Sequence, residues 1–393
     1  RLKAMIRGGG YDLIHSHGTR GNVMATFLKF VLKIPMVTTV HSDPKLDYLG
    51  RPLAGLIYGT LNAFALRRAD YIIGVSDSMK NLLIKRGFEP NNIFSIYNGV
   101  DFSIEPKNEE RLNYLRNLGL EVSEDSVVVG IAARLDPVKD VATLIRGFAE
   151  AEKSFANLRL VIAGDGAELE NLKQLTLDLG ISEKVCFAGW ISDINTFFAA
   201  LDINTLTSLS ETFPYALTEG ARASLATVSS RVGGIPKLII DGETGFLFRA
   251  GDYITLGRKL TELAENPELR KTLGGALFER AKREFSVEAT TQRQLDIYKE
   301  LFKREELSRK GERNGVVICG AYGMGNAGDD AILEAIVAEM REIDPFMPIT
   351  ALSRKPQETR SMFAVNSVHM FDVPAFHRAM KGTKLYLSGG GSL

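Results

Sequence analysis

Short apolar segments alternate with helical patterns along the whole chain, and this alternation constrains the fold more than any other feature. Residues 1–105 contain the strand-like segments YDLIHSH, IPMVTTVHSD, ADYIIGVSD and IFSIYNGVDF, with helical patterns between them. Strands that alternate with helices are typical of a parallel sheet with helices on both faces. The sequence therefore predicts an α/β protein built from doubly wound parallel sheets.

The alternation starts again twice. A charged segment without strand patterns, residues 106–125, is interpreted as a linker. A second series follows, with SVVVGIAARL, LRLVIAGDG, KVCFAGW, DINTLTS, ATVSS and GFLF. A long helix is predicted near residues 286–303, and KREELSRKGERN has the composition of a solvated hinge. The third start, NGVVICGAYGMGNAGDDAILEAIVAEM, is typical of a strand, a glycine-rich loop and a helix.

Length and composition exclude several classes of protein. The 393 residues are enough for two or three domains, and 48 Lys and Arg balance 48 Asp and Glu, so no global field points to nucleic acid. Residues 1–105 are basic, with 13 Lys and Arg against 8 Asp and Glu, which favours an anionic ligand or a membrane surface there. Cys186 and Cys319 lie in apolar strand patterns, so we expect packed thiols in a reducing compartment. No apolar stretch approaches the ~20 residues of a membrane-spanning helix.

Two cations follow the first strand of the second series. In AARLDPVKD, Arg134 lies at the carboxyl end of the strand and Lys139 near the start of the next helix. Ligands of open α/β sheets bind at the carboxyl ends of strands, and helix N-termini favour anions. The pair is suited to clamp a diphosphate. The alternative is two surface cations at the start of a helix.

Two glutamates lie eight positions apart in SETFPYALTE. We place Glu211 before a helix whose first turn includes Thr212, Phe213 and Pro214. Glu219 comes about two turns later, so both acids are expected on the same side. One carboxylate can accept hydrogen bonds from sugar hydroxyls and the other from ribose hydroxyls. The alternative is a helix edge in solvent, with the first acid favoured by the helix dipole.

Together with AGDG and SSRVGGIPKLIIDGETGFLF, these signals resemble the retaining glycosyltransferases of family 4, over about residues 1–305. The resemblance implies a GT-B fold, in which two Rossmann-like domains face one cleft and the C-terminal one holds most of a nucleotide-sugar. It assigns the phosphates to Arg134 and Lys139, the donor sugar to Glu211 and the ribose to Glu219. No D-x-D triplet occurs in the sequence, so no cofactor and no essential metal are expected.

The same resemblance gives roles to further residues. His41 matches a histidine near the reacting sugar, while His15 and His17 either face the acceptor or cap their strand. The remaining donor-site residues offer backbone amides or belong to loops beside the donor: Gly164, Asp165, Gly166, Thr212, Phe213, Asn98 and Gly99. Four positions depart from the family pattern, three where glycine is common and one where proline is common: Asp140, Thr212, Ser224 and Ala226.

The third series contains a second motif. Its loop, residues 323–328, satisfies G-x-G-x-x-G between a strand and a helix, as in dinucleotide-binding proteins. However, Asp329 and Asp330 at the helix start would repel a pyrophosphate, and Asp344 poorly matches the acid expected ~20 residues on. A nucleotide-dependent oxidoreductase is therefore a minor alternative.

GAYGMGNAGDDAILEAIV, followed by LYLSGGGSL, resembles instead the N-terminal part of polysaccharide pyruvyl transferases of the cell-wall type, over about residues 315–393. Those enzymes move a pyruvyl group from phosphoenolpyruvate onto a sugar. The resemblance implies phosphoenolpyruvate as a partner of the complete domain, and the residues that would hold it are expected beyond Leu393.

We predict four segments: an incomplete, acceptor-side Rossmann-like domain (1–107), a nucleotide-sugar-binding domain (108–288), a crossing helix with a linker (289–314) and the start of a pyruvyl transferase domain (315–393). The chain is interpreted as a fragment cut at both ends. The predicted function is retaining transfer of a sugar from a nucleotide-sugar to an envelope polysaccharide or a lipid-linked saccharide. We expect a cytoplasmic protein at the inner face of the membrane, with peripheral contact through the basic N-terminal domain. The alternative is a non-catalytic sugar-nucleotide-binding module beside a pyruvyl transferase.

Overall fold

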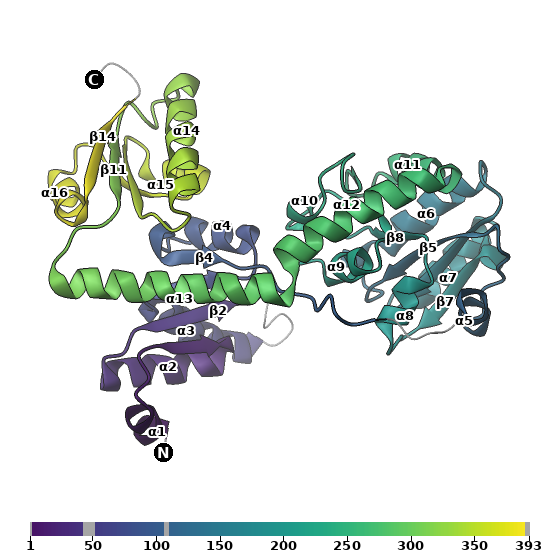
Figure 1. Ribbon diagram of the computed structural model, residues 1–393, viewed down its shortest axis with the longest axis horizontal. Coiled ribbons are helices and arrows are strands. Elements are labelled where there is room, and N and C mark those ends of the chain that lie inside the picture. Colours follow the sequence, from purple (N-terminus) through teal and green to yellow (C-terminus); the bar gives the residue numbers. More distant parts are fainter. Residues whose placement is uncertain (1, 42–51, 106–109, 390–393) are drawn as a thin grey trace. The chain divides into compact units, whose positions relative to one another are not determined.

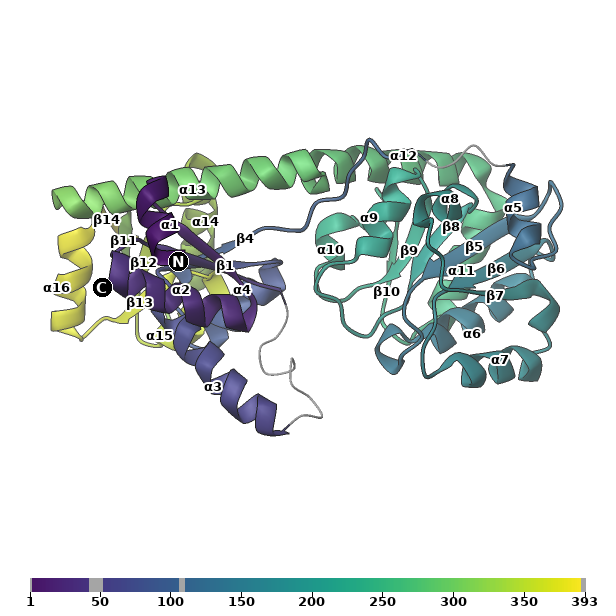
Figure 2. The ribbon, with the colours of Figure 1, turned by 90° about the horizontal axis from the view of Figure 1, so that it is seen from below.

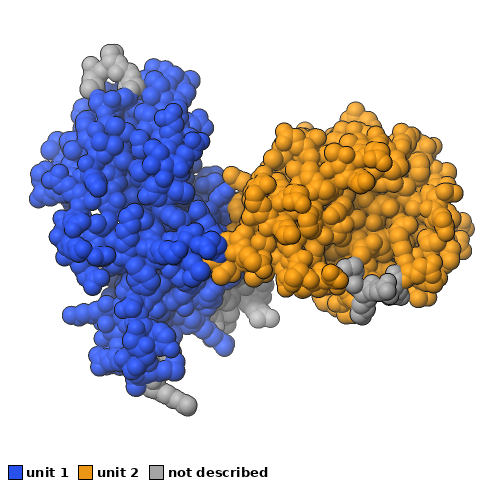
Figure 3. All heavy atoms as spheres, in the orientation of Figure 1, with its two compact units in different colours: residues 1–96, 292–393 blue, residues 97–291 orange. Residues whose placement is uncertain are grey.

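The computed structural model describes residues 2–41, 52–105 and 110–389. It contains three parallel sheets whose strands are connected by helices (Figure 1), so the predicted α/β class is confirmed. The chain divides into two compact units, one formed by residues 1–96 with 292–393 and the other by residues 97–291 (Figure 3). The boundaries of the four predicted segments stay a prediction.

The unit of residues 97–291 is a Rossmann-like domain with a six-stranded sheet of order β10-β9-β8-β5-β6-β7. The strand order reverses between β5 and β8, which is the topological switch point where such sheets bind ligands. The strands are β5 (Val127–Ala132), β6 (Leu158–Ala163), β7 (Val185–Gly189), β8 (Ile203–Leu206), β9 (Ala226–Ser230) and β10 (Phe246–Phe248). The helices are α5 (Arg111–Asn117), α6 (Val141–Glu152), α7 (Leu169–Asp178), α8 (Ile194–Ala199), α9 (Tyr215–Arg222), α10 (Ile235–Leu238), α11 (Tyr253–Glu265) and α12 (Pro267–Phe285).

Helices cover both faces of this sheet. Because the strands are buried on both sides, their sequences are nearly continuous apolar runs, as in VVVGIA of β5. One core cluster joins the sheet to α6, α11 and α12, and a smaller cluster joins it to α5 and α8. The Cys186 thiol on β7 is buried in the smaller cluster, as its apolar context predicted.

The linker predicted at residues 106–125 is wrong for the part of it that the structure describes. Residues 111–117 form α5, and Leu115, Leu120 and Val122 are buried in the smaller cluster. The Arg111 guanidinium forms an ion pair with Asp202 and donates from Nε to the Ala200 carbonyl at 3.0 Å. The polar residues lie on the exposed side of a single short helix. The average composition of the segment is therefore polar although its leucines are buried.

The first sheet of the other unit has the order β1-β2-β3-β4. Its strands are β1 (Ile14–His17), β2 (Met36–Val40), β3 (Tyr71–Gly74) and β4 (Ile93–Ser95), with α1 (Leu2–Gly9), α2 (Gly18–Leu32), α3 (Pro52–Arg68) and α4 (Asp77–Lys85). The predicted crossing helix is α13 (Val287–Lys310). Its Ile297 and Leu301 are buried against Val37, Tyr71 and Ile73 of this sheet, so its packing on the first sheet is confirmed.

The third sheet has the order β13-β12-β11-β14 and belongs to the same compact unit as the first. Its elements are β11 (Val316–Cys319), α14 (Ala327–Ile343), β12 (Ile349–Ser353), α15 (Pro356–Phe363), β13 (Asn366–His369), α16 (Val373–Gly382) and β14 (Leu385–Ser388). Figure 2 shows α13 passing both sheets. The Arg304 guanidinium of α13 donates to the carbonyl oxygens of Asn91 and Phe346 and pairs with Glu300. The segment interpreted as a hinge is therefore helical as far as Lys310.

We expect Leu115→Ala to lower the free energy of unfolding of the unit of residues 97–291 by about 2–5 kcal/mol, because it leaves a cavity under α5. The exposed Asn117→Ala on the same helix is the control and should change it by less than about 0.5 kcal/mol. Urea unfolding followed by far-ultraviolet circular dichroism measures this change, because the only tryptophan of the chain, Trp190, is already exposed in the folded state. Equal midpoints for Leu115→Ala and the wild type would restore the linker interpretation.

Candidate functional site

A cavity of about 380 Å³ lies at the carboxyl ends of β5, β6 and β7. Residues of the three loops that follow these strands line it, together with residues of α8 and α9: Ala132, Ala133, Arg134, Ala163, Gly164, Asp165, Trp190, Ile191, Ser192, Ile194 and Glu219. Ligand sites of doubly wound sheets occur at this edge. The cavity is therefore the candidate site of this unit.

Backbone contacts between the loops form the wall of the cavity. The amide of Ala133 donates to the carbonyl of Ala163 at 3.0 Å, and the amide of Gly164 donates to that of Gly189 at 2.7 Å. Gly164 has a φ of 132°, and a Cβ there would overlap the carbonyl oxygen of Ala133. A Cβ on Gly166 would likewise overlap the backbone of Leu135. Both glycines of AGDG are thus required for the loops to approach each other, and any side chain would push them apart.

Arg134 is the cation of the cavity. Its side chain is 74% exposed, and Nη2 lies 3.1 Å from the Asp136 carboxylate. A guanidinium has five donors, and one neighbouring carboxylate at its edge leaves several for an anionic ligand.

Two acids line the cavity, Asp165 and Glu219, and Asp165 accepts through Oδ1 from the amide of Gly166 at 2.7 Å. Glu219 is half-buried, and burial raises the pKa of its carboxyl group, while the positive charge of Arg222 acts in the opposite direction. Within the described residues, no hydrogen bond reaches this carboxylate. A half-buried carboxylate whose oxygens accept no hydrogen bond can accept from hydroxyl groups of a ligand.

Trp190 was not among the predicted site residues. It follows β7, its side chain is 81% exposed, and it lines the cavity. An exposed indole beside a cavity offers a flat apolar surface on which a base can stack. The signal in the sequence was a lone tryptophan immediately after an apolar strand, and it was interpreted only as the end of that strand.

Lys139 and Glu211 lie together at the switch point but do not line this cavity. The Lys139 ammonium forms an ion pair with Oε1 of Glu211, and their side chains are 19% and 9% exposed. The Ser208 hydroxyl donates to the same Oε1 at 2.7 Å, and the Thr207 hydroxyl donates to the carbonyl of Lys139 at 3.0 Å. The loops after β5 and β8 are therefore tied by a largely buried ion pair, so much of the Lys139 charge is neutralised by Glu211.

The predicted helix start is wrong. The helix α9 begins at Tyr215, so Glu211, Thr212 and Phe213 lie in the loop before it. The Phe213 ring is buried against Tyr97 and Phe285, which holds this segment in the loop conformation. Glu211 and Glu219 consequently do not share one helix face, and only Glu219 lines the cavity.

Glycines hold this loop from the other side. A Cβ on Gly233 would overlap the carbonyl oxygen of Glu211, and one on Gly234 would lie 2.7 Å from that of Thr212.

Two of the departures from the family pattern have a backbone consequence: Asp140 and Ser224 have φ values of 46° and 56°, in the left-handed region that favours glycine.

Asn98 and Gly99 lie outside the cavity lining. A Cβ on Gly99 would lie 2.7 Å from Cα of Val287, so the glycine allows the chain to pass the start of α13. The amide of Val100 donates to the carbonyl of Phe285 at 2.9 Å. The position of Gly99 is thus explained by packing.

The three histidines lie in the other unit, at the carboxyl ends of β1 and β2. Nδ1 of His17 lies 2.9 Å from Nε2 of His41, and both rings are exposed. His15 hydrogen-bonds through Nδ1 to the Tyr298 hydroxyl and through Nε2 to the Thr39 hydroxyl at 2.8 Å. Burial, reinforced by the charges of His17 and His41, lowers the pKa of His15 to about 4. His15 is therefore a packed, neutral residue at pH 7, whereas His17 and His41 are accessible.

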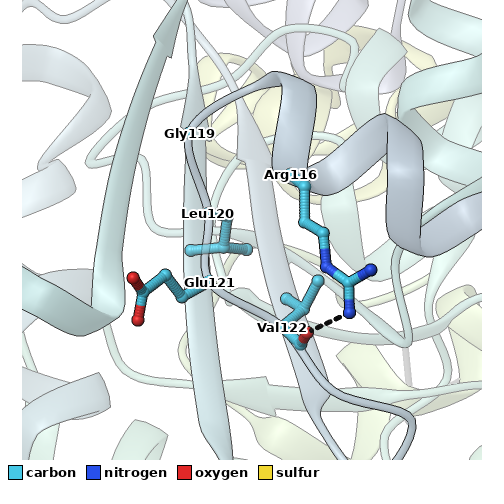
Figure 4. Close-up of a pocket in the computed structure, with 5 residues that line it drawn as sticks. All are labelled: Arg116, Gly119, Leu120, Glu121 and Val122. Carbon is cyan, nitrogen blue, oxygen red and sulfur yellow. Dashed lines mark hydrogen bonds between the residues drawn. The ribbon is translucent and has the colours of Figure 1, made fainter.

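A second cavity, of about 450 Å³, lies in the segment that leads into the amino end of β5 (Figure 4). It is lined by Arg116 and residues 119–122, and Nη2 of Arg116 donates to the Val122 carbonyl at 3.0 Å. Figure 4 shows the Glu121 side chain directed away from Arg116. The lining residues of this cavity precede β5 and do not include any loop that follows a strand of the sheet, and none of them is a predicted site residue.

A Rossmann-like sheet with a cation, an unpaired carboxylate and an exposed indole at its carboxyl edge defines a nucleotide-binding type of domain. Comparison with known families gives the class. Residues 1–103 match the model of Glycosyltransferase Family 4, and residues 119–279 match that of Glycosyl transferases group 1. Over these residues the chain is a glycosyltransferase of the group 1 and family 4 type, with the GT-B fold.

Individual relatives agree with this class. The chain is 26% identical over 307 residues to the putative glycosyltransferase EpsD of Bacillus subtilis, covering 76% of this chain and 79% of that one. It is 25% identical over 306 residues to the N-acetyl-alpha-D-glucosaminyl L-malate synthase of Bacillus anthracis, covering 75% and 76%. The crystal structure of HepE of Anabaena in complex with UDP superposes with a TM-score of 0.65 at 23% identity, covering 76% and 81%.

We expect Lys139→Ala to destabilise the unit of residues 97–291 by about 3 kcal/mol, because it leaves the largely buried Glu211 carboxylate without its partner. The double variant Lys139→Met/Glu211→Gln should recover most of this loss, since it removes both charges. Arg134→Ala is the control for an exposed cation. Urea unfolding followed by far-ultraviolet circular dichroism measures all three, and a double variant no more stable than Lys139→Ala would contradict the ion pair.

The lowered pKa of His15 predicts a pH dependence of stability. The unfolded state binds the proton more tightly than the folded state, so the stabilisation by the neutral ring is complete above pH 6.5 and is lost as the pH falls to about 4. Melting temperatures from circular dichroism should therefore fall less steeply over this range in His15→Gln than in the wild type. The exposed His377→Gln is the control, and identical slopes for His15→Gln and the wild type would contradict the assignment.

Proposed function

We propose that the protein transfers a sugar from a nucleotide-sugar donor to an envelope polysaccharide or a lipid-linked saccharide, with retention of anomeric configuration. The observation that carries this proposal is the cavity at the ends of β5, β6 and β7, where an open guanidinium, an unpaired carboxylate and an exposed indole converge. These three groups match the phosphate, the ribose and the base of a nucleotide. The solved structures of HepE with UDP and with UDP-glucose support a donor of this chemistry.

Each group has one task in this proposal. Arg134 holds the diphosphate, Glu219 accepts hydrogen bonds from the ribose hydroxyls, and Trp190 stacks on the base. Glu211 contacts the donor sugar through Oε2, since Lys139 and Ser208 occupy Oε1. Charge that develops on the leaving diphosphate is stabilised by the Arg134 guanidinium. The diphosphate then helps to deprotonate the acceptor hydroxyl on the same face of the sugar, which retains the configuration.

We propose that this step requires no metal ion and no other cofactor, because arginine at the phosphates supplies the positive charge. Turnover should then survive dialysis against EDTA. His41 and His17 are accessible in the other unit; His41 is proposed to lie near the reacting sugar and His17 to face the acceptor, in the cytoplasm at the inner face of the membrane.

Nucleotide binding tests the assignment of the cavity. We expect UDP to quench Trp190 fluorescence and to raise the melting temperature of the chain. Trp190→Ala and Glu219→Gln should each weaken UDP binding about tenfold, which corresponds to ~1.4 kcal/mol. Glu211→Gln should leave UDP affinity nearly unchanged and lower the turnover of a UDP-sugar, because its partner hydroxyls belong to the sugar. Thermal shifts with UDP and GDP measure the loss of nucleotide affinity. Equal losses of UDP affinity in Glu219→Gln and Glu211→Gln would contradict the assignment of Glu219 to the ribose and Glu211 to the sugar.

A non-catalytic sugar-nucleotide-binding module is the alternative. It would bind UDP-sugars with the same cavity but would neither hydrolyse them nor transfer the sugar. Release of UDP from UDP-sugars in the presence of saccharide acceptors separates the two, with Arg134→Ala as the inactive control that should lower turnover about 10²-fold.

For residues 315–393 we propose the N-terminal part of a polysaccharide pyruvyl transferase. In support, the loop after β11 reaches the carboxyl end of β14 at the switch point of the third sheet, where the Tyr322 hydroxyl donates to the carbonyl of Gly389. The dinucleotide alternative is weakened, because the Asn326 side chain already accepts from the amide of Gly328 at the start of α14. In addition, Asp344 lies at the end of α14, whereas Arg354 follows β12 at the place of the ribose-binding acid.

Assays with phosphoenolpyruvate test this second part. A gene product extended beyond Leu393 should release phosphate from phosphoenolpyruvate only when a saccharide acceptor is present, and mass spectrometry should find a pyruvyl ketal on the product. NADH titration, which should give no fluorescence change, controls for the oxidoreductase alternative.

A further inference from the structure

The helix α2 is turned so that its larger apolar side chains face solvent. Its buried residues are Asn22, Ala25, Thr26 and Leu28, of which two are polar. The neighbouring helix α3, which packs beside it, also exposes large apolar residues. The exposed set is called the apolar face here and consists of Val23, Met24, Phe27, Phe30, Leu61 and Phe64. Phe27, Phe30 and Phe64 are 62%, 56% and 53% exposed.

A buried polar network sets this orientation. Asn22 accepts from the Ser16 hydroxyl at 2.8 Å and also from the Thr38 hydroxyl, and its Nδ2 donates to Asn62 of α3 at 2.9 Å. These bonds fix the polar side of both helices against β1 and β2. Turning the phenylalanines inward would break these buried hydrogen bonds, which the present orientation preserves. The apolar face is therefore built into the fold.

Cations surround the apolar face. The Arg68 guanidinium lies over two of its rings, 5.9 Å from the centroid of Phe30 and 5.1 Å from that of Phe64. Arg20 and Lys33 are also exposed on or beside α2, whereas the Arg67 guanidinium of α3 lies over the Phe88 ring, outside the apolar face. Neither helix contains an acidic residue. Two acids, Asp70 and Glu305, line a cavity together with Phe30 and Lys33. Asp70 is occupied by Lys29 at 2.6 Å and by the amide of Met36, and Glu305 accepts from the Tyr71 hydroxyl at 3.1 Å.

We propose that the apolar face is a docking surface for a bilayer with anionic lipids. Aromatic side chains with a basic rim suit the boundary between headgroups and acyl chains, and the basic residues add attraction to an anionic leaflet. A second copy of the chain fits less well, because a twofold contact would bring the same cations against each other. None of the described helices combines the length and the apolar composition needed to cross a membrane, so the contact is peripheral. This inference deepens the membrane location given under the proposed function.

The test is co-sedimentation of the 393-residue chain with vesicles. The wild type should bind vesicles of phosphatidylcholine with phosphatidylglycerol and bind pure phosphatidylcholine more weakly. Phe27→Ser/Phe30→Ser/Phe64→Ser should lower partitioning into anionic vesicles at least tenfold, because the buried apolar area is lost. Lys33→Gln and Arg68→Gln should each lower it about fivefold, and only when the vesicles are anionic.

Phe371→Ser is the matched control, because Phe371 is also 68% exposed with an arginine, Arg354, 5.5 Å from its ring centroid, but lies outside the apolar face. It should bind vesicles like the wild type. Failure of the wild type to bind, wild-type binding by the triple variant, or a dimer in light scattering that the triple variant abolishes would overturn the proposal. UDP thermal shifts in the same preparations keep this outcome separate from that of the donor site.

Discussion

The close approach of backbone loops at the carboxyl edge of the six-stranded sheet is the constraint on which the candidate site depends. Gly164 and Gly166 let the loop after β6 lie against the backbone of Ala133 and Leu135, and Gly233 does the same for the loop that carries Glu211. These contacts leave no room for a Cβ, so they set the positions of the loops before any side chain contributes. Arg134, Trp190 and Glu219 can converge on one cavity only because the loops beneath them are fixed in this way.

Arg134 and Lys139, which the sequence motif predicted to act as a pair, have different physical roles. Arg134 is exposed and remains open to an anion, whereas Lys139 is largely buried and held by Glu211. A buried ion pair adds little net stability, but removing one partner is costly. The pair at the switch point therefore acts first as a tie between the loops after β5 and β8. In a donor complex it would also hold Glu211 in place, with Oε2 free of the contacts that Oε1 makes.

Most of the strands, the doubly wound class and the burial of both cysteines could be predicted from the sequence, because apolar runs between helical patterns report directly on parallel sheets. The site could be predicted in part. Arg134 and Glu219 share a cavity, but the position of Glu211 could not be derived from spacing, because the buried ring of Phe213 delays the start of α9 to Tyr215. Trp190 could not be predicted as a site residue, because a single tryptophan after a strand forms no recognisable motif. The helix in residues 111–122 could not be predicted from the charged composition of this segment, because a short helix can bury Leu115 and still be polar on average.

The helix α2 shows why a sequence pattern alone can predict a helix but not which face of that helix is buried. Its sequence is apolar on nearly every side, so no stripe indicates which residues turn inward. The decision is made by Asn22, whose side chain must find partners once it is enclosed, and which finds them on β1, β2 and α3. Because the hydrogen-bonded side chain of Asn22 is buried, the phenylalanines Phe27 and Phe30 of α2 are exposed. For the proposed docking on a bilayer this exchange would have a function, because apolar side chains that are unfavourable in water are favourable at the interface between lipid and water.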